Sequence, residues 1–190
     1  MKRKEKKQKS FLLDVLEVVC STAIIVFLLI NFVLIPCKVD GDSMYPTLKD
    51  KDFGYSFVCT KNIGVNRFDI CVLDVGEKLI VKRVIGLPGD TIEYNDNQLY
   101  INGIPYDEPY LVGVTTNDLQ VNLGEDEYFC LGDNRNVSKD SRFYGAFTID
   151  DFVATNILVL LPFENFGVKK WAFNGSLVTC RRRLGRWRNN

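Results

Sequence analysis

Ser43 has the sequence setting of a reactive hydroxyl. It lies in the segment Gly-Asp-Ser-Met-Tyr-Pro, in which Gly41 allows backbone angles closed to other residues and Pro46 fixes its own φ. Such a segment forms a sharp turn that can present a hydroxyl to a substrate. The same composition also suits a turn without function, so Ser43 needs a nearby base to become a candidate nucleophile.

Lys82 is the candidate base. It lies in the apolar run Leu79–Ile85, where strand alternation places Ile80, Lys82 and Val84 on one face. Burial among apolar neighbours lowers the pKa of a lysine, and a fall from about 10.4 to about 8 requires roughly 3 kcal/mol. Because the sequence contains no histidine, imidazole bases are excluded and a neutral lysine is the simplest activator of Ser43.

A polar loop from Gly132 to Arg142 follows a third short apolar strand. Its density of short polar side chains indicates a hydrogen-bonded scaffold. Ser138 is placed to orient a neutral lysine, and Asp140 and Arg142 are placed to form an ion pair that holds the loop. A surface turn with casual ion pairs is the alternative interpretation of this segment alone.

The N-terminus has the charge pattern of a membrane anchor. Residues 1–10 form a strongly basic tail, and the run Val18–Pro36 has no charged residue. We expect residues 11–36 to form one helix long enough to cross about 30 Å of hydrocarbon. The basic flank predicts a cytoplasmic N-terminus and an external remainder. A cleaved secretory signal is the alternative, which the length of the apolar run and the lack of a small-x-small site disfavour.

Beyond Pro36 the pattern predicts a mainly β domain with antiparallel pairing, because short segments rich in β-branched and aromatic residues alternate with turn residues. The expected strands are Asp69–Asp74, Leu79–Ile85, Thr91–Tyr94, Gln98–Ile101, Glu127–Leu131 and Ile157–Leu161. Asn102-Gly103 favours a tight hairpin, and Phe152–Phe163 is better explained as a buried strand than as a second span. The predicted domain covers residues 37–180. The basic tail 181–190 fits either a solvated terminus or contact with anionic lipid.

Charge and cysteine content narrow the function classes. The 24 basic residues balance 24 acidic ones, which gives no net field for nucleic acid. Six cysteines without a C-x-x-C pair and without histidine give no support for a metal site, and nothing indicates a cofactor. One or two disulfides are compatible with an exported domain, but the spacing assigns none.

Three motifs in this order resemble the type I signal peptidases of bacteria. They are Ser-Met-Tyr-Pro from Ser43, the stretch Lys-Arg-Val-Ile-Gly-Leu-Pro-Gly-Asp from Lys82, and the loop Gly132–Arg142. The resemblance implies an antiparallel β-sheet catalytic domain behind one transmembrane α-helix. It also implies a single-pass enzyme of the cytoplasmic membrane that removes signal peptides from exported preproteins on the outer side. Signal peptides and the lipid bilayer are the expected partners.

The resemblance also implies residue roles. Ser43 would attack the scissile carbonyl, Lys82 would take its proton and later give it to the leaving amine, and Ser138 would position the lysine. Asp140 and Arg142 match the structural ion pair of the family, with Asp133 in the same network.

The resemblance leaves one donor to the oxyanion open. The backbone N–H of Ser43 would be the first donor. Some family members carry a serine two positions before the nucleophile as a second donor, whereas this sequence has Gly41 there.

Substrate binding is expected beside the nucleophile and the base. Leu34–Val39 and Leu79–Val81 could pair with an extended substrate by strand addition, with Ile35, Ile80 and Val81 lining shallow pockets. Such pockets admit alanine and crowd larger side chains, which fits cleavage after a small-x-small sequence.

Two other function classes compete with this interpretation. A self-cleaving Ser-Lys protease like the SOS-type repressors shares the catalytic pair but lacks an N-terminal anchor. A membrane-tethered binding or assembly module would keep the fold without the chemistry, although all five motif residues named for the site are present here.

Overall fold

A computed structural model describes residues 2–58, 64–111 and 118–169 of the 190-residue chain. The elements, in chain order, are α1 Lys2–Phe32, β1 Leu34–Lys38, β2 Phe53–Val58, β3 Ile70–Asp74, β4 Leu79–Gly86, β5 Thr91–Asn95, β6 Gln98–Ile101, β7 Ile104–Tyr106, β8 Leu119–Asn122, β9 Phe129–Leu131, α2 Ser141–Tyr144, the 3-10 turn η1 Ile149–Asp151, β10 Phe152–Leu161, the 3-10 turn η2 Phe163–Asn165 and β11 Gly167–Lys169. The six strands expected from the sequence are all present, each within a few residues of its expected bounds.

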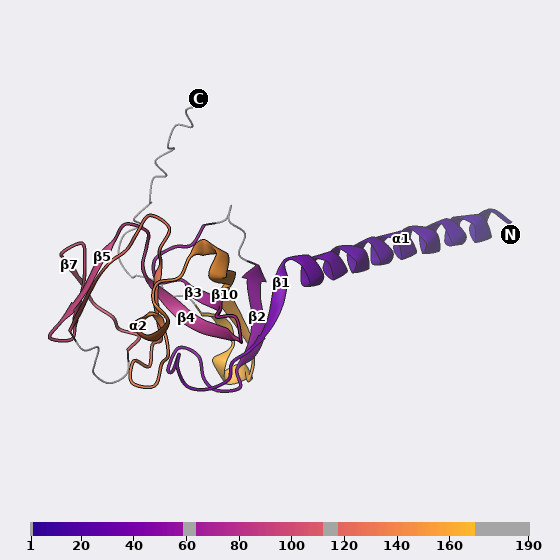
Figure 1. Ribbon diagram of the computed structural model, residues 1–190. Helices are drawn as coiled ribbons and strands as arrows, with labels where there is room; N and C mark the ends of the chain where they lie inside the picture. Colours follow the sequence, from indigo (N-terminus) through magenta and orange to yellow (C-terminus); the bar gives the residue numbers. More distant parts are fainter. Residues whose placement is uncertain (1, 59–63, 112–117, 170–190) are drawn as a thin grey trace, which may run out of the picture.

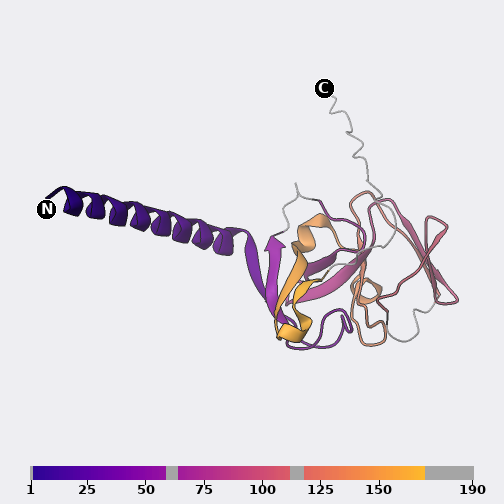
Figure 2. The same cartoon turned by 180° about the vertical axis from the view of Figure 1, so that it is seen from behind.

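Helix α1 projects away from the β body as a rod (Figures 1 and 2). Apolar side chains along it are exposed, including Leu13, Ile24 and Phe27 at 65%, 60% and 63%. Within the part of the chain that the structure describes, no helix is long and apolar enough to count as a membrane span.

The helix ends earlier than the sequence predicted. It stops at Phe32, whereas the expected anchor ran to Pro36. The reason is strand pairing: Leu34–Lys38 forms β1 and pairs antiparallel with β2. Proline lacks the N–H that a helix interior requires, and as an edge-strand residue Pro36 loses little by this.

Two antiparallel sheets make up the body. The larger has the order β1-β2-β10-β3-β4-β9, with β11 also paired to β10. The smaller has the order β7-β6-β5-β8 and lies at the end of the body remote from α1 (Figure 1). The prediction of a mainly antiparallel β domain is confirmed, and the run from Phe152 is a sheet strand, as expected.

The smaller sheet owes its hairpins to residues that accept positive φ. Asn102 and Gly103 have φ of 53° and 77° and join β6 to β7, and Asp96 and Asn97 have φ of 48° and 63° between β5 and β6. Asparagine, aspartate and glycine tolerate this left-handed region best, and two such residues make the turn that suits strand twist. The hairpin expected at Asn102-Gly103 is therefore confirmed.

Strand β4 lies where the apolar cores meet. One core, including Val72 and Ile157, fills the space under the turn of Ser43, and another, including Leu73 and Val84, lies against Lys82's side of the sheet. A third joins the smaller sheet to Ile85 and Leu131. Burying this apolar surface fixes β4 from several directions, and with it the residues that β4 carries.

The expectations for the cysteines and for the basic tail can be followed only where the structure describes these residues. The cysteines that the structure describes, Cys20, Cys37, Cys71 and Cys130, are free thiols. Cys59, Cys180 and the basic tail 181–190 lie outside the described residues.

Candidate active site

The Ser43 turn is built on a buried floor. Gly41 has φ +89°, a conformation that favours glycine, and its N–H donates to Asp50 Oδ1 at 2.9 Å. Met44 and Leu48 are 1% and 0% exposed and anchor the chain directly after the serine. The turn that the sequence predicted is therefore held from below, with Ser43 left half-buried at its top.

Lys82 reaches Ser43 from β4. Its Nζ lies 2.9 Å from Ser43 Oγ and also donates to the carbonyl of Val81 at 2.7 Å. Only 3% of the residue is exposed. Burial lowers the pKa of Lys82 to about 8, against a smaller raising effect from the negative charge of Asp140. A large share of this lysine is therefore neutral in mildly alkaline solution.

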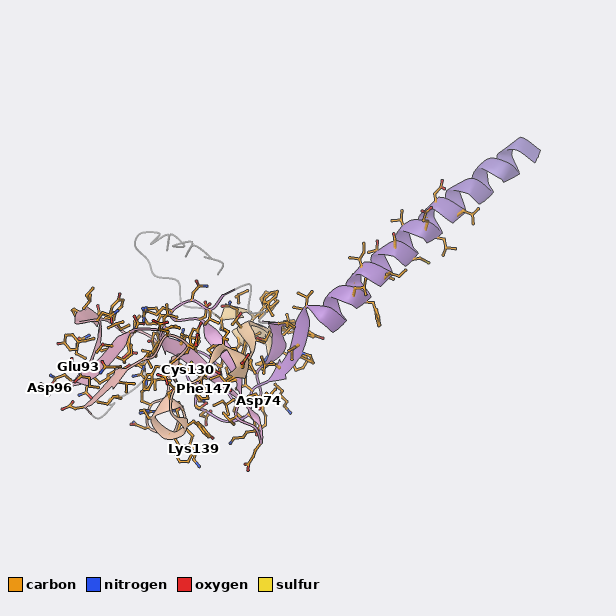
Figure 3. The ribbon with its side chains drawn as sticks, turned by 45° about the horizontal axis from the view of Figure 1, so that its top comes forward. Asp74, Glu93, Asp96, Cys130, Lys139 and Phe147 are labelled. Atoms are coloured by element: carbon orange, nitrogen blue, oxygen red, sulfur yellow. The ribbon has the colours of Figure 1, made fainter. Side chains whose placement is uncertain are left out.

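A cavity of about 640 Å³ opens over this pair. Ile80, Val81, Asn134 and Lys139 are among its lining residues, and Figure 3 shows Lys139 at the outer edge of the body. The structure thus places two of the three predicted substrate-binding residues at the cavity. Ile35 is not among the lining residues, because β1 pairs with β2 and its side chain packs on the core beneath.

The polar loop packs directly against the nucleophile. The N–H of Asn134 donates to the carbonyl of Ser43 at 3.0 Å. A side chain at Gly132 would overlap Ser138 and that same carbonyl, so glycine permits the close approach. The loop and the Ser43 turn therefore behave as one packed unit.

Ser138 lies in this unit and forms no hydrogen bond to the lysine amine in the part of the chain that the structure describes. Its Oγ is buried and forms no hydrogen bond of ordinary geometry among the residues that the structure describes, although it lies near enough to Asp140 to help lower the pKa of that carboxyl. In the described chain the Lys82 amine bonds to Ser43 and to the carbonyl of Val81 and not to Ser138, so the positioning role of Ser138 stays a prediction.

Asp140 and Arg142 form the expected ion pair. Arg142 Nε and Nη2 lie 2.8 Å from Asp140 Oδ1 and 2.8 Å from Oδ2. Asp140 also accepts from the N–H of Gly132 at 3.0 Å. Burial alone would raise the pKa of the Asp140 carboxyl, but these hydrogen bonds outweigh it and hold that pKa below its ordinary value.

Asp133 forms its ion pair with Arg83, which the sequence analysis did not single out. Arg83 Nε and Nη2 lie 2.8 Å from Asp133 Oδ1 and 2.6 Å from Oδ2, and both side chains are 1% exposed. Among the described residues no hydrogen bond joins Arg83 or Asp133 directly to Asp140, and the shared network expected for Asp133 stays a prediction. A second charge in an apolar strand, directly after Lys82, was the available signal.

The described residues contain no group of three or more histidine, cysteine, aspartate or glutamate side chains that could hold a metal ion. The chemistry that the site can perform with its own groups is nucleophilic attack by Ser43 with proton transfer through Lys82.

Comparison with known proteins assigns the family. The model of the family described as "Signal peptidase, peptidase S26" matches residues 12–161. The chain belongs to this signal peptidase family. Signal peptidase I S of Bacillus subtilis (strain 168) is 38% identical over 178 residues, which cover 86% of this chain and 97% of that protein. Signal peptidase IB of Staphylococcus aureus (strain COL) is 34% identical over 177 residues, covering 80% and 93%.

A signal peptidase I from Enterococcus faecalis V583 has a crystal structure that is 35% identical to this chain. That match covers 48% of this chain and 96% of the other, with a TM-score of 0.45. The family match includes Ser43, Lys82 and the whole loop from Gly132 to Arg142. An enzymatic activity of the signal peptidase class is thereby established for this chain.

Proposed function

We propose that this chain is a membrane-bound serine endopeptidase that removes N-terminal signal peptides from exported preproteins, with Ser43 as nucleophile and Lys82 as general base. The observation that carries the proposal is the separation of 2.9 Å between Lys82 Nζ and Ser43 Oγ in a buried setting. Burial makes the amine available as a base, and the hydroxyl is the group within its reach.

The reaction follows from this pair. Neutral Lys82 accepts the proton of Ser43 as Oγ attacks the scissile carbonyl and forms a tetrahedral intermediate. The resulting ammonium then gives its proton to the leaving amine, and the acyl group remains on Ser43. Lys82, neutral again, takes a proton from water as that water attacks the acyl-enzyme, and it returns the proton to Ser43 Oγ as the ester bond breaks and the second product leaves.

The oxyanion needs donors aimed above the Ser43 turn. Among the described residues none accepts a hydrogen bond from the Ser43 N–H, which leaves this group available to the oxyanion. The N–H of Gly41 is already engaged by Asp50, so it is a poor candidate for the second donor.

Substrate is proposed to bind as an extended strand beside β4. Leu79–Val81 pair with β3 on one side, and the pairing of β4 with β9 on the other side starts only at Arg83. The edge at Leu79–Val81 therefore remains for a substrate strand, with Ile80 and Val81 at the cavity. Shallow apolar walls of this kind favour small substrate side chains at alternate positions.

Membrane attachment is proposed through the apolar part of α1. The basic flank and the charge-free run of the sequence support a cytoplasmic N-terminus and an external catalytic domain in the bacterial cytoplasmic membrane. The domain would then follow the helix directly at the outer surface.

Cleavage of a preprotein tests the proposal. We expect the purified full chain to cleave a secretory preprotein, and Ser43→Ala and Lys82→Ala each to lower kcat/KM by about a thousandfold or more. The double variant should be little worse than either single variant, because the two residues act as one unit. A non-catalytic module predicts no cleavage by any of these proteins, and substantial activity in Lys82→Ala would exclude Lys82 as the base.

The pH dependence provides a second readout. Because only neutral Lys82 can accept the proton, kcat/KM should rise with pH around an apparent pKa near 8 and level off above it. Lys82→Arg should be inactive throughout, since guanidinium does not deprotonate in this range. A plateau already complete at pH 6 would contradict the assignment.

A further inference from the structure

The smaller sheet contributes a buried charged cluster to the loop that holds the nucleophile. Arg135 of the loop forms an ion pair with Glu108, which follows β7, and the two side chains are 3% and 4% exposed. Arg135 Nη1 also donates to the hydroxyl of Tyr94 on β5 at 2.7 Å. The Tyr94 hydroxyl lies 3.0 Å from Glu108 Oε1, and the hydroxyl of Tyr110 donates to the same oxygen at 2.8 Å.

The cluster fixes the protonation states of its members: Arg135 stays charged and Tyr94 stays neutral. Burial opposes the charge of Arg135, but the attraction and hydrogen bonds of the Glu108 carboxylate outweigh it, and the pKa of the guanidinium is raised. Burial raises the pKa of Tyr94 far above its ordinary value, so its hydroxyl stays protonated.

Arg135 passes this constraint directly to the catalytic loop. Its Nε donates to the carbonyl of Gly132 at 3.0 Å, and its own carbonyl accepts from Arg142 Nη2 at 2.7 Å. Arg142 in turn holds Asp140, which accepts from the N–H of Gly132. A closed ring of hydrogen bonds thus sets the shape of the loop, and Arg135 is the member of that ring that reaches the smaller sheet.

The loop held by this ring contacts the backbone of the nucleophile. Asn134, next to Arg135, donates its N–H to the carbonyl of Ser43, and Gly132 packs against that carbonyl. The cluster also meets the second network, because the Arg83 guanidinium lies 4.1 Å from the centre of the Tyr110 ring. A shift of the cluster therefore moves the support of Ser43 and the strand that bears Lys82.

Stability alone is a weak reason for such a cluster. Replacing a buried ion pair with apolar residues of similar volume is often neutral or stabilising, whereas a charged pair with several directed hydrogen bonds fixes one geometry. Arg135 is bonded to Gly132 and Arg142 and is next to Asn134 in the chain, and Gly132 and Asn134 are the loop residues that contact the carbonyl of Ser43.

We propose that Glu108, Tyr94 and Arg135 form a positioning unit for the signal peptidase reaction, through which the smaller sheet fixes the distance between Ser43 and Lys82. None of the three contacts the reacting atoms. The inference rests on the proposed roles of Ser43 and Lys82, and it assigns the smaller sheet a part in the chemistry.

Glu108→Gln in the full chain is the central test, with Asp90→Asn as its matched control. Asp90 also forms a largely buried ion pair, with Arg67 at 2.8 Å, but that pair bonds to Ile85, Leu87 and Asn102 and not to the loop. Both variants remove one carboxylate from a buried pair. They differ in whether the lost charge supports Arg135.

The measurements are kcat, KM, the apparent pKa of kcat/KM and the melting temperature, all for cleavage of one preprotein. We expect Glu108→Gln to lower kcat about tenfold to a hundredfold with little change in KM, as small displacements of reacting groups do. The apparent pKa should rise, because a loosened loop admits water to Lys82 and weakens the burial that lowers its pKa. The charges of Asp140, Asp133 and Lys78 and the thiol of Cys71 act on the same amine, so their residues are left unchanged. Asp90→Asn should keep the wild-type kcat and apparent pKa.

Two further variants test the same cluster independently of Glu108→Gln. Tyr94→Phe removes one hydroxyl from the cluster and should give a smaller loss of the same kind, so it replaces Glu108→Gln if that variant does not fold. Arg135→Lys keeps the charge and loses the forked geometry, and we expect it to resemble Glu108→Gln.

The outcomes separate the two proposals. If wild-type protein does not cleave, the proposed function fails. If wild-type protein cleaves and Glu108→Gln or Tyr94→Phe keeps its kcat and apparent pKa, the positioning role is overturned. The same follows if Asp90→Asn changes both quantities as much as Glu108→Gln does, since the effect would then track stability alone.

Discussion

Lys82 and Arg83, the two neighbouring cations of β4, are both buried but have opposite kinds of partner. Lys82 and Arg83 are 3% and 1% exposed, so both are removed from water to a similar extent. Arg83 forms a forked ion pair with Asp133 and also donates to the carbonyl of Phe68 at 3.0 Å. In the described chain Lys82 has no ion pair, and its amine contacts a hydroxyl and a carbonyl.

Neighbouring residues of a strand point to opposite faces, so Lys82 and Arg83 lie on the two faces of β4. The difference between them separates a structural charge from a reactive one. A buried cation with a bidentate carboxylate keeps its proton and fixes geometry. A buried amine without a carboxylate in contact has a lowered pKa, so it exchanges its proton nearer to neutral pH than an exposed lysine does. The strand therefore holds a permanent charge on one face and a switchable one on the other.

Arg83→Met should give the largest change in stability. It leaves the Asp133 carboxylate buried beside Thr47 without its cation, and breaking a buried pair in this way costs about 3–5 kcal/mol. Chemical denaturation of the variant and the wild-type protein measures the difference. Arg83→Met combined with Asp133→Leu should recover a large part of the loss, because no unpaired charge then remains. If Arg83→Met alone were as stable as wild type, the ion pair between Arg83 and Asp133 would not contribute to the stability of the fold.

Lys82→Met should act in the opposite direction on stability while abolishing cleavage. The folded-state pKa of about 8 lies below the ordinary value of 10.5, so folding at neutral pH works against the bound proton. By linkage the variant should gain about 3 kcal/mol relative to wild type below pH 8, and the gain should fade as pH rises from 8 to 10.5. Denaturation at pH 7 and at pH 10 measures both values. An advantage that does not change between them would mean that Lys82 has an ordinary pKa in the fold.

The contrast between the two cations explains which parts of the site could be predicted from sequence. The strand alternation around Lys82 and the lack of histidine were enough to indicate a desolvated amine, and the structure places it beside Ser43 as the motifs implied. The short segments with turn residues between them likewise predicted the antiparallel strands, because hairpins and strand periodicity are local properties.

Contacts between segments that are distant in the chain could not be predicted in the same way. Arg83 and Asp133 are fifty positions apart, and Glu108 and Arg135 meet only because the smaller sheet folds against the loop. The end of α1 was misplaced because the pairing of Leu34–Lys38 with β2 is a tertiary effect. Ile35 does not line the cavity for the same reason, since the pairing of β1 with β2 turns it to the core.

Lys78→Gln gives the smallest effect and the finest test of the contrast between the two faces. Lys78 lies at the rim of the cavity, and its positive charge contributes to the low pKa of Lys82 after the larger effect of burial. Removing that charge should raise the apparent pKa of kcat/KM by a few tenths, equivalent to about 0.5 kcal/mol, without changing the melting temperature appreciably. Lys78→Glu should shift it about twice as far. Both shifts should shrink in 1 M salt, where exposed charges are screened over about 3 Å.

The control is Lys49→Gln, which removes an exposed lysine that does not line the cavity and should leave the profile unchanged. If Lys78→Gln and Lys49→Gln give the same profile at low salt, the rim charge has no part in tuning the pKa of Lys82.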